Sequence, residues 1–471
     1  MNIYLIGLLA YSALLMTVGI VISRRIKTAS DFLVAGRRLG PGLIFTTFLA
    51  ANLGAGSTVG ATGLGYRLGL SAWWWVGSAS IGTFVLATML GPRLWEIAQR
   101  YSLHTMGDFL EWRYGRSVKA VIAVLLWLGT LAILAGQLIA ISWILNVVIG
   151  LPKWAGCAIG GAVAIVYCSA GGLVAAAFVN IVELTVTMSG LLLAVPFALS
   201  GVGGWGHLTQ TISASATSSA PLLSLTGIGL KPILAYVAIL VPSFIVSPGL
   251  VQKLYGARDQ KTVRLGVGLN SLAQAGFAIV PALLGLCALA AFPHLNNPEL
   301  ALPTVMMKLL PKWLGIWGLA SIFSAELSAT DAILFMLSTS LTVDLYKTFL
   351  NPKVEDRRLL SVSRMAAVMS GVMGVILAIL LPSVIAAVKI FYGLLAVSLF
   401  APVVLGLYWK GATWRAALAS IAGAVGVTLT VSRFTRGEGL WLLSPQAIGI
   451  GTAFVILVVT SKIFSAANER E

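Results

Sequence analysis

Long apolar runs separated by short polar segments recur along the whole sequence, and this pattern constrains the fold more than any other feature. A transmembrane helix needs about 20 consecutive, mostly apolar residues, and about thirteen such runs can be counted. Only 10% of the residues are charged, which leaves too few polar side chains to cover a soluble protein. We therefore predict one all-α polytopic membrane domain over residues 1–471, with about thirteen transmembrane helices. The predicted spans are 3–23, 41–65, 70–91, 120–148, 155–172, 176–200, 230–251, 266–291, 315–343, 363–381, 384–408, 413–432 and 446–465.

The basic residues indicate how these helices are oriented. Of the 31 Lys and Arg, about 23 fall in loops on one side of the membrane and about 6 on the other, and such an excess marks the cytoplasmic side. The N-terminus is thus predicted outside and the C-terminus in the cytoplasm, in the cell membrane. The first run is expected to be a retained anchor, because no basic segment precedes it. Topology accounts for the net charge of +16, so the lipid bilayer and not nucleic acid is the expected partner.

Two of the predicted spans contain residues that interrupt a helix. The second span carries five glycines from Gly54 to Gly65, and the seventh contains Pro242 and Pro248, each of which removes a backbone donor. In a membrane, interruptions occur only where protein or water lines a cavity. Two interrupted spans at matching places, five helices apart, indicate inverted repeats around a binding site at the membrane midplane. The alternative explanation of the glycines is close packing between helices.

Few ionisable residues lie inside the predicted spans, namely Glu183, Glu326, Asp331 and Lys389. Each is costly in hydrocarbon and is expected to face a polar cavity or a partner. In the ninth span, Ser324, Ser328 and Asp331 share one helical face, and their oxygens suit a small, hard cation such as Na+. The alternatives are hydroxyl bonds to carbonyls one turn earlier and structural contacts between helices. The three histidines have no metal-ligand spacing, so no metal other than Na+ is expected.

Several runs of the sequence resemble the sodium:solute symporter family. They are DFLVAGRRLG (31–40), the glycine-rich run 48–69, YCSAGGLVAAAFVNIVEL (167–184), LVQKLYGARDQKTVR (250–264) and TSLTVDLYK (339–347), and the resemblance extends over about 3–465. It implies a LeuT-like fold with a five-plus-five inverted repeat, of which repeat one is about 41–200 and repeat two about 230–408. Span 1 at 3–23 and two peripheral helices at about 413–465 lie outside the repeats. The resemblance also implies a secondary active transporter, not an enzyme, that couples a small organic solute to Na+ by alternating access and needs no other cofactor.

The sodium site of this family uses oxygens from the second and ninth spans. On the matching positions of this sequence, the resemblance implies the carbonyls of Ala50, Leu53 and Ala325 and the side chain of Ser328. The next position, usually Ser or Thr in the family, is Ala329, so one hydroxyl ligand is missing. Thr330 or a water molecule could replace it.

A second departure from the family lies in the sixth span, where Asn180 stands at the position of an aspartate. Some members use that aspartate for an additional sodium, so the resemblance argues against a second ion here. Glu183 lies one turn further on the same face. We expect Glu183, Glu326 or Asp331 to carry a proton or to help hold a cation, and H+ coupling therefore stays open.

Solute contacts are expected at the two interrupted spans and in the eleventh span. The matching residues are Asn52, Ser57, Ser243, Phe244 and Lys389. An ammonium at Lys389 would pair with a carboxylate, which favours a monocarboxylate, an amino acid or a vitamin acid, although a lysine can also extend to the membrane interface. Sugar-carrying relatives place an acid in the third span, and 72–80 contains none, so a sugar is disfavoured. A membrane sensor with a transporter fold is the alternative from another class.

Overall fold

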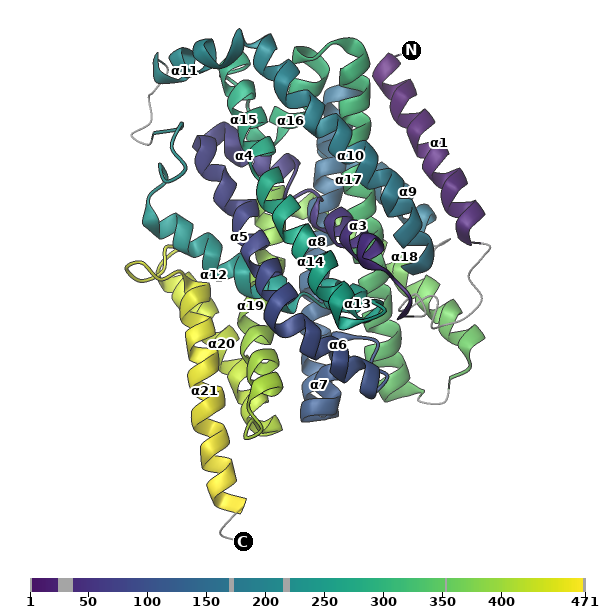
Figure 1. Cartoon of the computed structure of the whole chain (residues 1–471), viewed down its shortest axis with the longest axis vertical. Coiled ribbons are helices and arrows are strands. Elements are labelled where there is room, and N and C mark those ends of the chain that lie inside the picture. The colour runs from purple at the N-terminus through teal and green to yellow at the C-terminus, as the bar shows by residue number, and fades with distance from the viewer. Residues whose placement is uncertain (1, 24–36, 169–172, 215–220, 352–353, 469–471) are drawn as a thin grey trace.

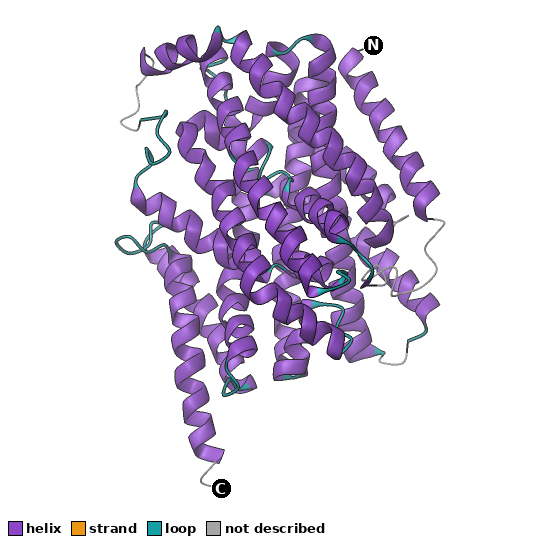
Figure 2. Ribbon diagram, viewed as in Figure 1, coloured by secondary structure: helices purple, strands orange, loops and turns teal. Residues whose placement is uncertain are grey.

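The structure is a computed structural model that describes residues 2–23, 37–168, 173–214, 221–351 and 354–468. Almost all of these residues are helical (Figure 2). Within the described ranges, extended pairing is confined to two isolated bridges, Leu39 with Ala257 and Leu440 with Leu443. The predicted all-α class is confirmed.

The first half of the chain forms helices of very different length, from short surface helices to one of 34 residues. They are α1 (Ile3–Ser23), α3 (Pro41–Asn52), α4 (Val59–Leu68), α5 (Trp73–Val85), α6 (Gly91–Arg100), α7 (Met106–Tyr114), α8 (Arg116–Ile149), α9 (Lys153–Cys168), α10 (Leu173–Gly201) and α11 (Gly204–Ala214). A 3-10 turn at Gly69–Ala72 and a π-helical turn at Leu86–Leu90 join α4, α5 and α6 into a continuous helical stretch.

The second half continues in the same manner. Its helices are α12 (Leu230–Val246), α13 (Pro248–Tyr255), α14 (Gln260–Phe277), α15 (Ile279–Ala291), α16 (Ala301–Thr304), α17 (Lys312–Thr339), α18 (Asp356–Leu380), α19 (Val384–Tyr408), α20 (Trp414–Phe434) and α21 (Pro445–Asn468). A 3-10 turn at Pro298–Leu300 precedes α16, and π-helical segments at Val305–Leu309 and Ser340–Leu350 follow α16 and α17. Asp259, Ser383 and Thr413 begin α14, α19 and α20 by accepting a backbone N–H of the first turn.

Ten helical stretches within the described residues are long and apolar enough to cross a membrane. Three shorter apolar helices, Ile3–Leu15, Pro41–Asn52 and Lys153–Ile165, fall on further predicted spans. The chain therefore has the helices of a multi-pass membrane protein, and the count of thirteen crossings stays a prediction.

The predicted interruptions coincide with helix ends. Helix α3 ends at Asn52 and α4 begins at Val59, and the segment between them is tied together by Ser57 N–H and Thr58 N–H, which donate to the Gly54 carbonyl at 2.9 and 3.1 Å. Helix α12 ends at Val246, and α13 begins at Pro248. Proline is favoured at the first helical position because its missing N–H would have had no partner there.

In Figure 1, α3 and α13 lie near the middle of the view, whereas α4 and α12 lie toward its left side. Helix α3 packs against α10, α14 and α17, while α12 packs against α5 and α19. Helix α1 runs along one edge of the bundle and α21 along another, with the N- and C-termini at opposite ends of the molecule (Figure 1). Helices α20 and α21 pack mainly on each other and on α19, as the predicted peripheral pair would.

The glycines of the second predicted span serve two purposes. A Cβ on Gly65 would lie 2.8 Å from the Pro281 carbonyl oxygen, and one on Gly285 would lie 2.5 Å from the Thr62 carbonyl oxygen. Helices α4 and α15 can therefore approach closely only because both positions lack side chains. Gly54 and Gly56 belong to the interruption itself. The packing explanation thus holds for α4, and the interruption lies at its N-terminal side.

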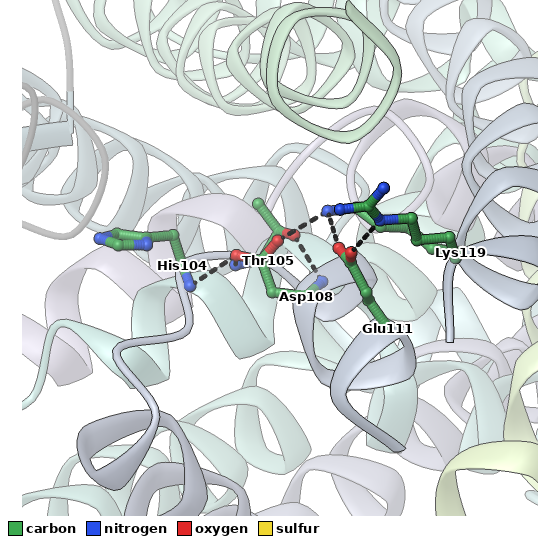
Figure 3. A network of polar contacts seen from close by, with 6 residues as sticks. His104, Thr105, Asp108, Glu111 and Lys119 are labelled. Atoms are coloured by element: carbon green, nitrogen blue, oxygen red, sulfur yellow. Dashed lines mark hydrogen bonds and ion pairs between the residues drawn. The ribbon is translucent and has the colours of Figure 1, made fainter. Parts of the chain in front are cut away.

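The predicted loop 92–119 contains α6, α7 and the first turn of α8. Thr105 and Asp108 form a capping box at the start of α7, and Lys119 Nζ lies 2.9 Å from both Asp108 Oδ1 and Glu111 Oε2 (Figure 3). Burial alone would raise the pKa of Asp108. The Lys119 ammonium and the N–H groups of His104 and Thr105 outweigh that effect and hold the pKa below its ordinary value. This cluster fixes α7 to the base of α8.

Candidate cation and solute site

The residues predicted for the cation site lie on α17, on α3 and at Leu53 directly after α3, and these two helices pack against each other. All of them are buried, namely Ala50, Leu53, Ala325, Ser328, Ala329 and Thr330. Ala50 belongs to the last turn of α3, whose carbonyls lack partners within the helix. The C-terminal end of a helix also carries a partial negative charge. Carbonyl oxygens and the Ser328 hydroxyl are oxygen donors of the type that a hard cation such as Na+ prefers.

The hydroxyls of Thr330 and Ser324 on α17 form hydrogen bonds with other groups of the protein. Thr330 Oγ1 donates to the Glu326 carbonyl one turn earlier at 2.6 Å, so it does not replace the hydroxyl that Ala329 lacks. Ser324 Oγ accepts from Tyr11 Oη at 2.6 Å and donates to the Glu183 carbonyl at 3.1 Å. Ser324 therefore joins α17 to α1 and α10.

The three predicted carboxylates occupy different places. Glu326 is completely buried; its Oε1 accepts from Thr58 Oγ1 at 2.7 Å, and its Oε2 has no hydrogen-bond partner among the described residues. Glu326 thus fastens α17 to the α3–α4 interruption. Glu183 is buried on α10 and Asp331 is half-buried on α17, and both act electrostatically on Lys253 of α13. Asn180 stands at the family position of an aspartate, and its side chain lies outside the described residues.

A cavity of about 80 Å³ lies between the two interruptions. Of the predicted solute contacts, Asn52, Ser57 and Phe244 line it. Ser243 lies outside the cavity, and its Oγ donates to the Tyr392 carbonyl at 2.7 Å, so it joins α12 to α19. Lys389 also lies outside the cavity; it is exposed, with Nζ 5.7 Å from the centre of the Tyr236 ring. This position agrees with the alternative explanation given above, in which the lysine side chain extends away from the site.

Amide side chains hold the α3–α4 interruption in place on one side of the cavity. Gln137 Oε1 on α8 accepts from the Ala55 backbone N–H at 2.8 Å. Asn52 Nδ2 donates to Asn270 Oδ1 and Gln274 Oε1 on α14, both at 3.4 Å. Backbone groups freed from helical bonding are thereby partnered by side chains, as the low-polarity interior requires.

Aromatic rings form another wall of the cavity. Trp75 Nε1 on α5 donates to the Gly56 carbonyl at 2.8 Å. The Tyr392 ring lies 5.2 Å from the rings of Phe244 and Phe391 and 6.3 Å from Trp75, between centroids. This wall can pack against the apolar part of a solute.

Sequence reasoning missed Lys253, which lines the cavity and is only 5% exposed. Its Nζ donates to the Thr47 carbonyl on α3 at 2.9 Å. The signal was available, because Gly249 and Lys253 are one helical turn apart in the helix that starts at Pro248. Residues on that face of α13 point into the cavity.

A smaller cavity of about 20 Å³ lies between α7, α8 and α13, and Met336 of α17 lines both cavities. It includes Thr105 and Met106 at the start of α7. A route from the central cavity toward α7 would therefore pass Met336.

The sequence profile of the sodium:solute symporter family matches residues 32–423. The chain belongs to this family. It is 27% identical to the sodium/pantothenate symporter of Escherichia coli (strain K12) over 452 residues, which cover 89% of each chain. It is 24% identical to the sodium/glucose cotransporter of Vibrio parahaemolyticus over 458 residues, 88% of this chain and 82% of the relative.

A solved structure supports the fold. A Na+-coupled sialic acid symporter in its substrate-bound outward-open state superposes with a TM-score of 0.80 at 16% identity, over 98% of both chains. At that identity the likeness concerns the fold alone. Family members are transporters, and the expectation that this chain is a multi-pass transporter agrees with its family.

Proposed function

We propose that this protein is a secondary active symporter that uses the Na+ gradient to move a small organic solute by alternating access. The observation that carries the proposal is the convergence of two interrupted elements, α3–α4 and α12–α13, on one cavity beside α17. Helix ends of this kind supply charge-binding backbone groups at the membrane midplane. The matched family and its sodium-coupled relatives point the same way.

The proposal includes the finer architecture. The chain crosses the cell membrane about thirteen times, with the N-terminus outside and the C-terminus in the cytoplasm. Residues 41–200 and 230–408 form the two inverted repeats. In this orientation α7 lies on the cytoplasmic side, and the second cavity beside Met336 marks the route by which solute leaves.

The coupling ion binds between α3 and α17 in this proposal. The carbonyls of Ala50, Leu53 and Ala325 and the hydroxyl of Ser328 hold Na+, and water completes the shell because Ala329 has no hydroxyl and Thr330 bonds within its helix. Ion binding holds α3 against α17 and favours the state that accepts solute. This differential affinity is what couples the two gradients.

A proton is the second candidate for the coupling ion, and the burial of Glu326 favours it. A carboxyl that bonds Thr58 with one oxygen and has no described partner for the other can hold a proton without an ion. Glu183 and Asp331 are the other two carboxylates proposed as proton carriers.

Uptake into liposomes that contain the purified protein tests the function. An inward Na+ gradient at equal pH on both sides is expected to drive accumulation of at least one solute from a panel of pantothenate, lactate, proline, glucose and choline. Ser328→Ala should raise the Na+ concentration for half-maximal uptake, while Ser324→Ala, one turn earlier and bonded to Tyr11, should not. Uptake driven by a pH gradient alone would favour the proton, and indifference to both gradients would refute symport.

A further inference from the structure

The charge of the solute cavity is set by one residue. Among the described residues that line the cavity, Lys253 is the charged one, and no aspartate or glutamate is among them. Glu183 and Asp331 act on Lys253 electrostatically, but neither lines the cavity. Within the described residues, the wall of the cavity therefore carries a basic group and no acidic one.

The hydrogen bonding of this ammonium is incomplete. An ammonium has three N–H donors, and within the described part of the chain Lys253 Nζ makes one hydrogen bond, to the Thr47 carbonyl at 2.9 Å. The side chain is only 5% exposed. A buried ammonium needs charged or polar partners to offset its lost hydration. A group in the cavity is placed to supply them.

The N-terminal ends of two helices also make the cavity more positive. Helix α13 begins at Pro248 and α4 at Val59, and Ser247 and Ser57 beside these ends line the cavity. The N-terminal end of a helix carries a partial positive charge and favours anions. These ends are a minor contribution beside the full charge of Lys253.

We propose that the solute is an organic anion whose carboxylate binds Lys253 Nζ. This inference rests on the proposed symport function and names the class of its solute. The apolar part of the anion packs on the wall of Trp75, Phe244 and Tyr392, and the amides of Gln137 and Gln274 face its remaining polar groups. A quaternary ammonium would also suit an aromatic wall, but Lys253 repels it. A neutral sugar would supply no negative charge to the ammonium from the cavity side.

Matched acids and amides test this selectivity, because they differ in charge and hardly in shape. The purified full-length protein in detergent with Na+ is titrated with L-lactate against L-lactamide and with phenylacetate against phenylacetamide, and its melting temperature is recorded. Glucose and choline serve as the neutral and cationic probes. At least one acid should stabilise the protein in Na+, and its amide should bind roughly 10- to 150-fold more weakly, the range for a lost charge-assisted hydrogen bond.

Variants then assign the effect to Lys253. Lys253→Gln should remove the preference for acid over amide, Lys253→Arg should retain it, and Lys389→Gln, outside the cavity, should leave it unchanged. If Lys253→Gln does not fold, the arginine variant and the wild-type acid-to-amide ratio still decide the question. Equal binding of acid and amide, or stabilisation by glucose or choline but by neither acid, would overturn the anion assignment and leave symport standing. Stabilisation by an acid with no dependence on Na+ would instead count against sodium coupling and leave the anion assignment standing.

Discussion

The close approach of Gly54 to α17 gives a sharp test of the proposed cation site. A Cβ atom added to Gly54 would lie 2.6 Å from Ala329 Cβ and 2.8 Å from Gln137 Oε1. Carbon atoms pack at about 3.5–4.0 Å, so Gly54→Ala must push the α3–α4 segment away from α17 by roughly 1 Å. The proposed Na+ ligands lie on both sides of this contact, and the substitution should therefore separate them.

The size of the effect follows from the strain. Overpacking a well-packed interior costs about 1–3 kcal/mol. This strain raises the free energy of the arrangement in which α3 and α17 are close. That arrangement is the proposed ion-binding state. Gly54→Ala should then raise the Na+ concentration for half-maximal uptake roughly 5- to 150-fold. Initial rates of uptake into proteoliposomes, measured against Na+ at constant ionic strength and pH, provide the number.

A neighbouring glycine supplies the control. A Cβ on Gly56 would meet Val388 side-chain carbons at 3.6 Å, which is ordinary contact, so Gly56→Ala should leave the Na+ dependence as in the wild type. Adding Ala329→Gly to Gly54→Ala removes the 2.6 Å contact and should restore part of the Na+ affinity. The reasoning is refuted if the folded Gly54→Ala protein shows wild-type Na+ dependence, or if Gly56→Ala impairs it equally.

Substitutions at four further positions test other parts of the structure. Gln137→Leu leaves the Ala55 N–H without its acceptor and should destabilise the protein by about 1–3 kcal/mol in detergent melts, whereas Gln137→Glu keeps an acceptor and should cost less. Lys119→Met removes the cation between α7 and α8 and should lower the melting temperature. The loss of unfolding free energy should be at most about 3–5 kcal/mol, the cost of breaking a fully buried ion pair. Because the folded-state pKa of Asp108 is lowered, its contribution is complete above the ordinary carboxyl pKa and is lost as the pH falls through the folded value, so Asp108→Asn should flatten the acid side of the stability profile. Lys389→Gln should leave solute uptake unchanged, and a selective loss of carboxylate uptake would contradict its position outside the cavity.

The sequence predicted the all-helical class well because that class depends on local chemistry. Apolar length alone identifies a crossing helix, and Pro248 and the glycines after Asn52 stand where helices end and begin. Helix α8 begins at Arg116, four residues before the predicted span, which begins at 120. Lys119 is buried there because Asp108 and Glu111 on α7 neutralise it, and a hydropathy pattern cannot show a partner from another helix.

The individual roles on α17 were harder to predict. Ser324 and Ser328 share a face, yet Ser324 bonds Tyr11 and the Glu183 carbonyl. A serine hydroxyl can satisfy itself on its own helix, on a neighbour or on an ion. Which of these occurs depends on how closely neighbouring helices approach, and that distance is not encoded in the helical period. The buried carboxylate of Glu326 was identified correctly as unusual, but its contact with Thr58 required the structure.

The two lysines show why position within a span is a poor guide to function. Lys389 lies near the expected depth of the site, but α19 is rotated so that its ammonium lies over Tyr236 outside the cavity. Lys253 lies just beyond the predicted seventh span, which ends at residue 251. The interruption at Pro248 starts a new helix, and the helical phase of Lys253 must be counted from that proline. Counted in this way, Lys253 falls on the face of Gly249, which lines the cavity. In this chain the charged residue one turn after the helix interruption lines the cavity, whereas the charged residue within the unbroken helix α19 does not.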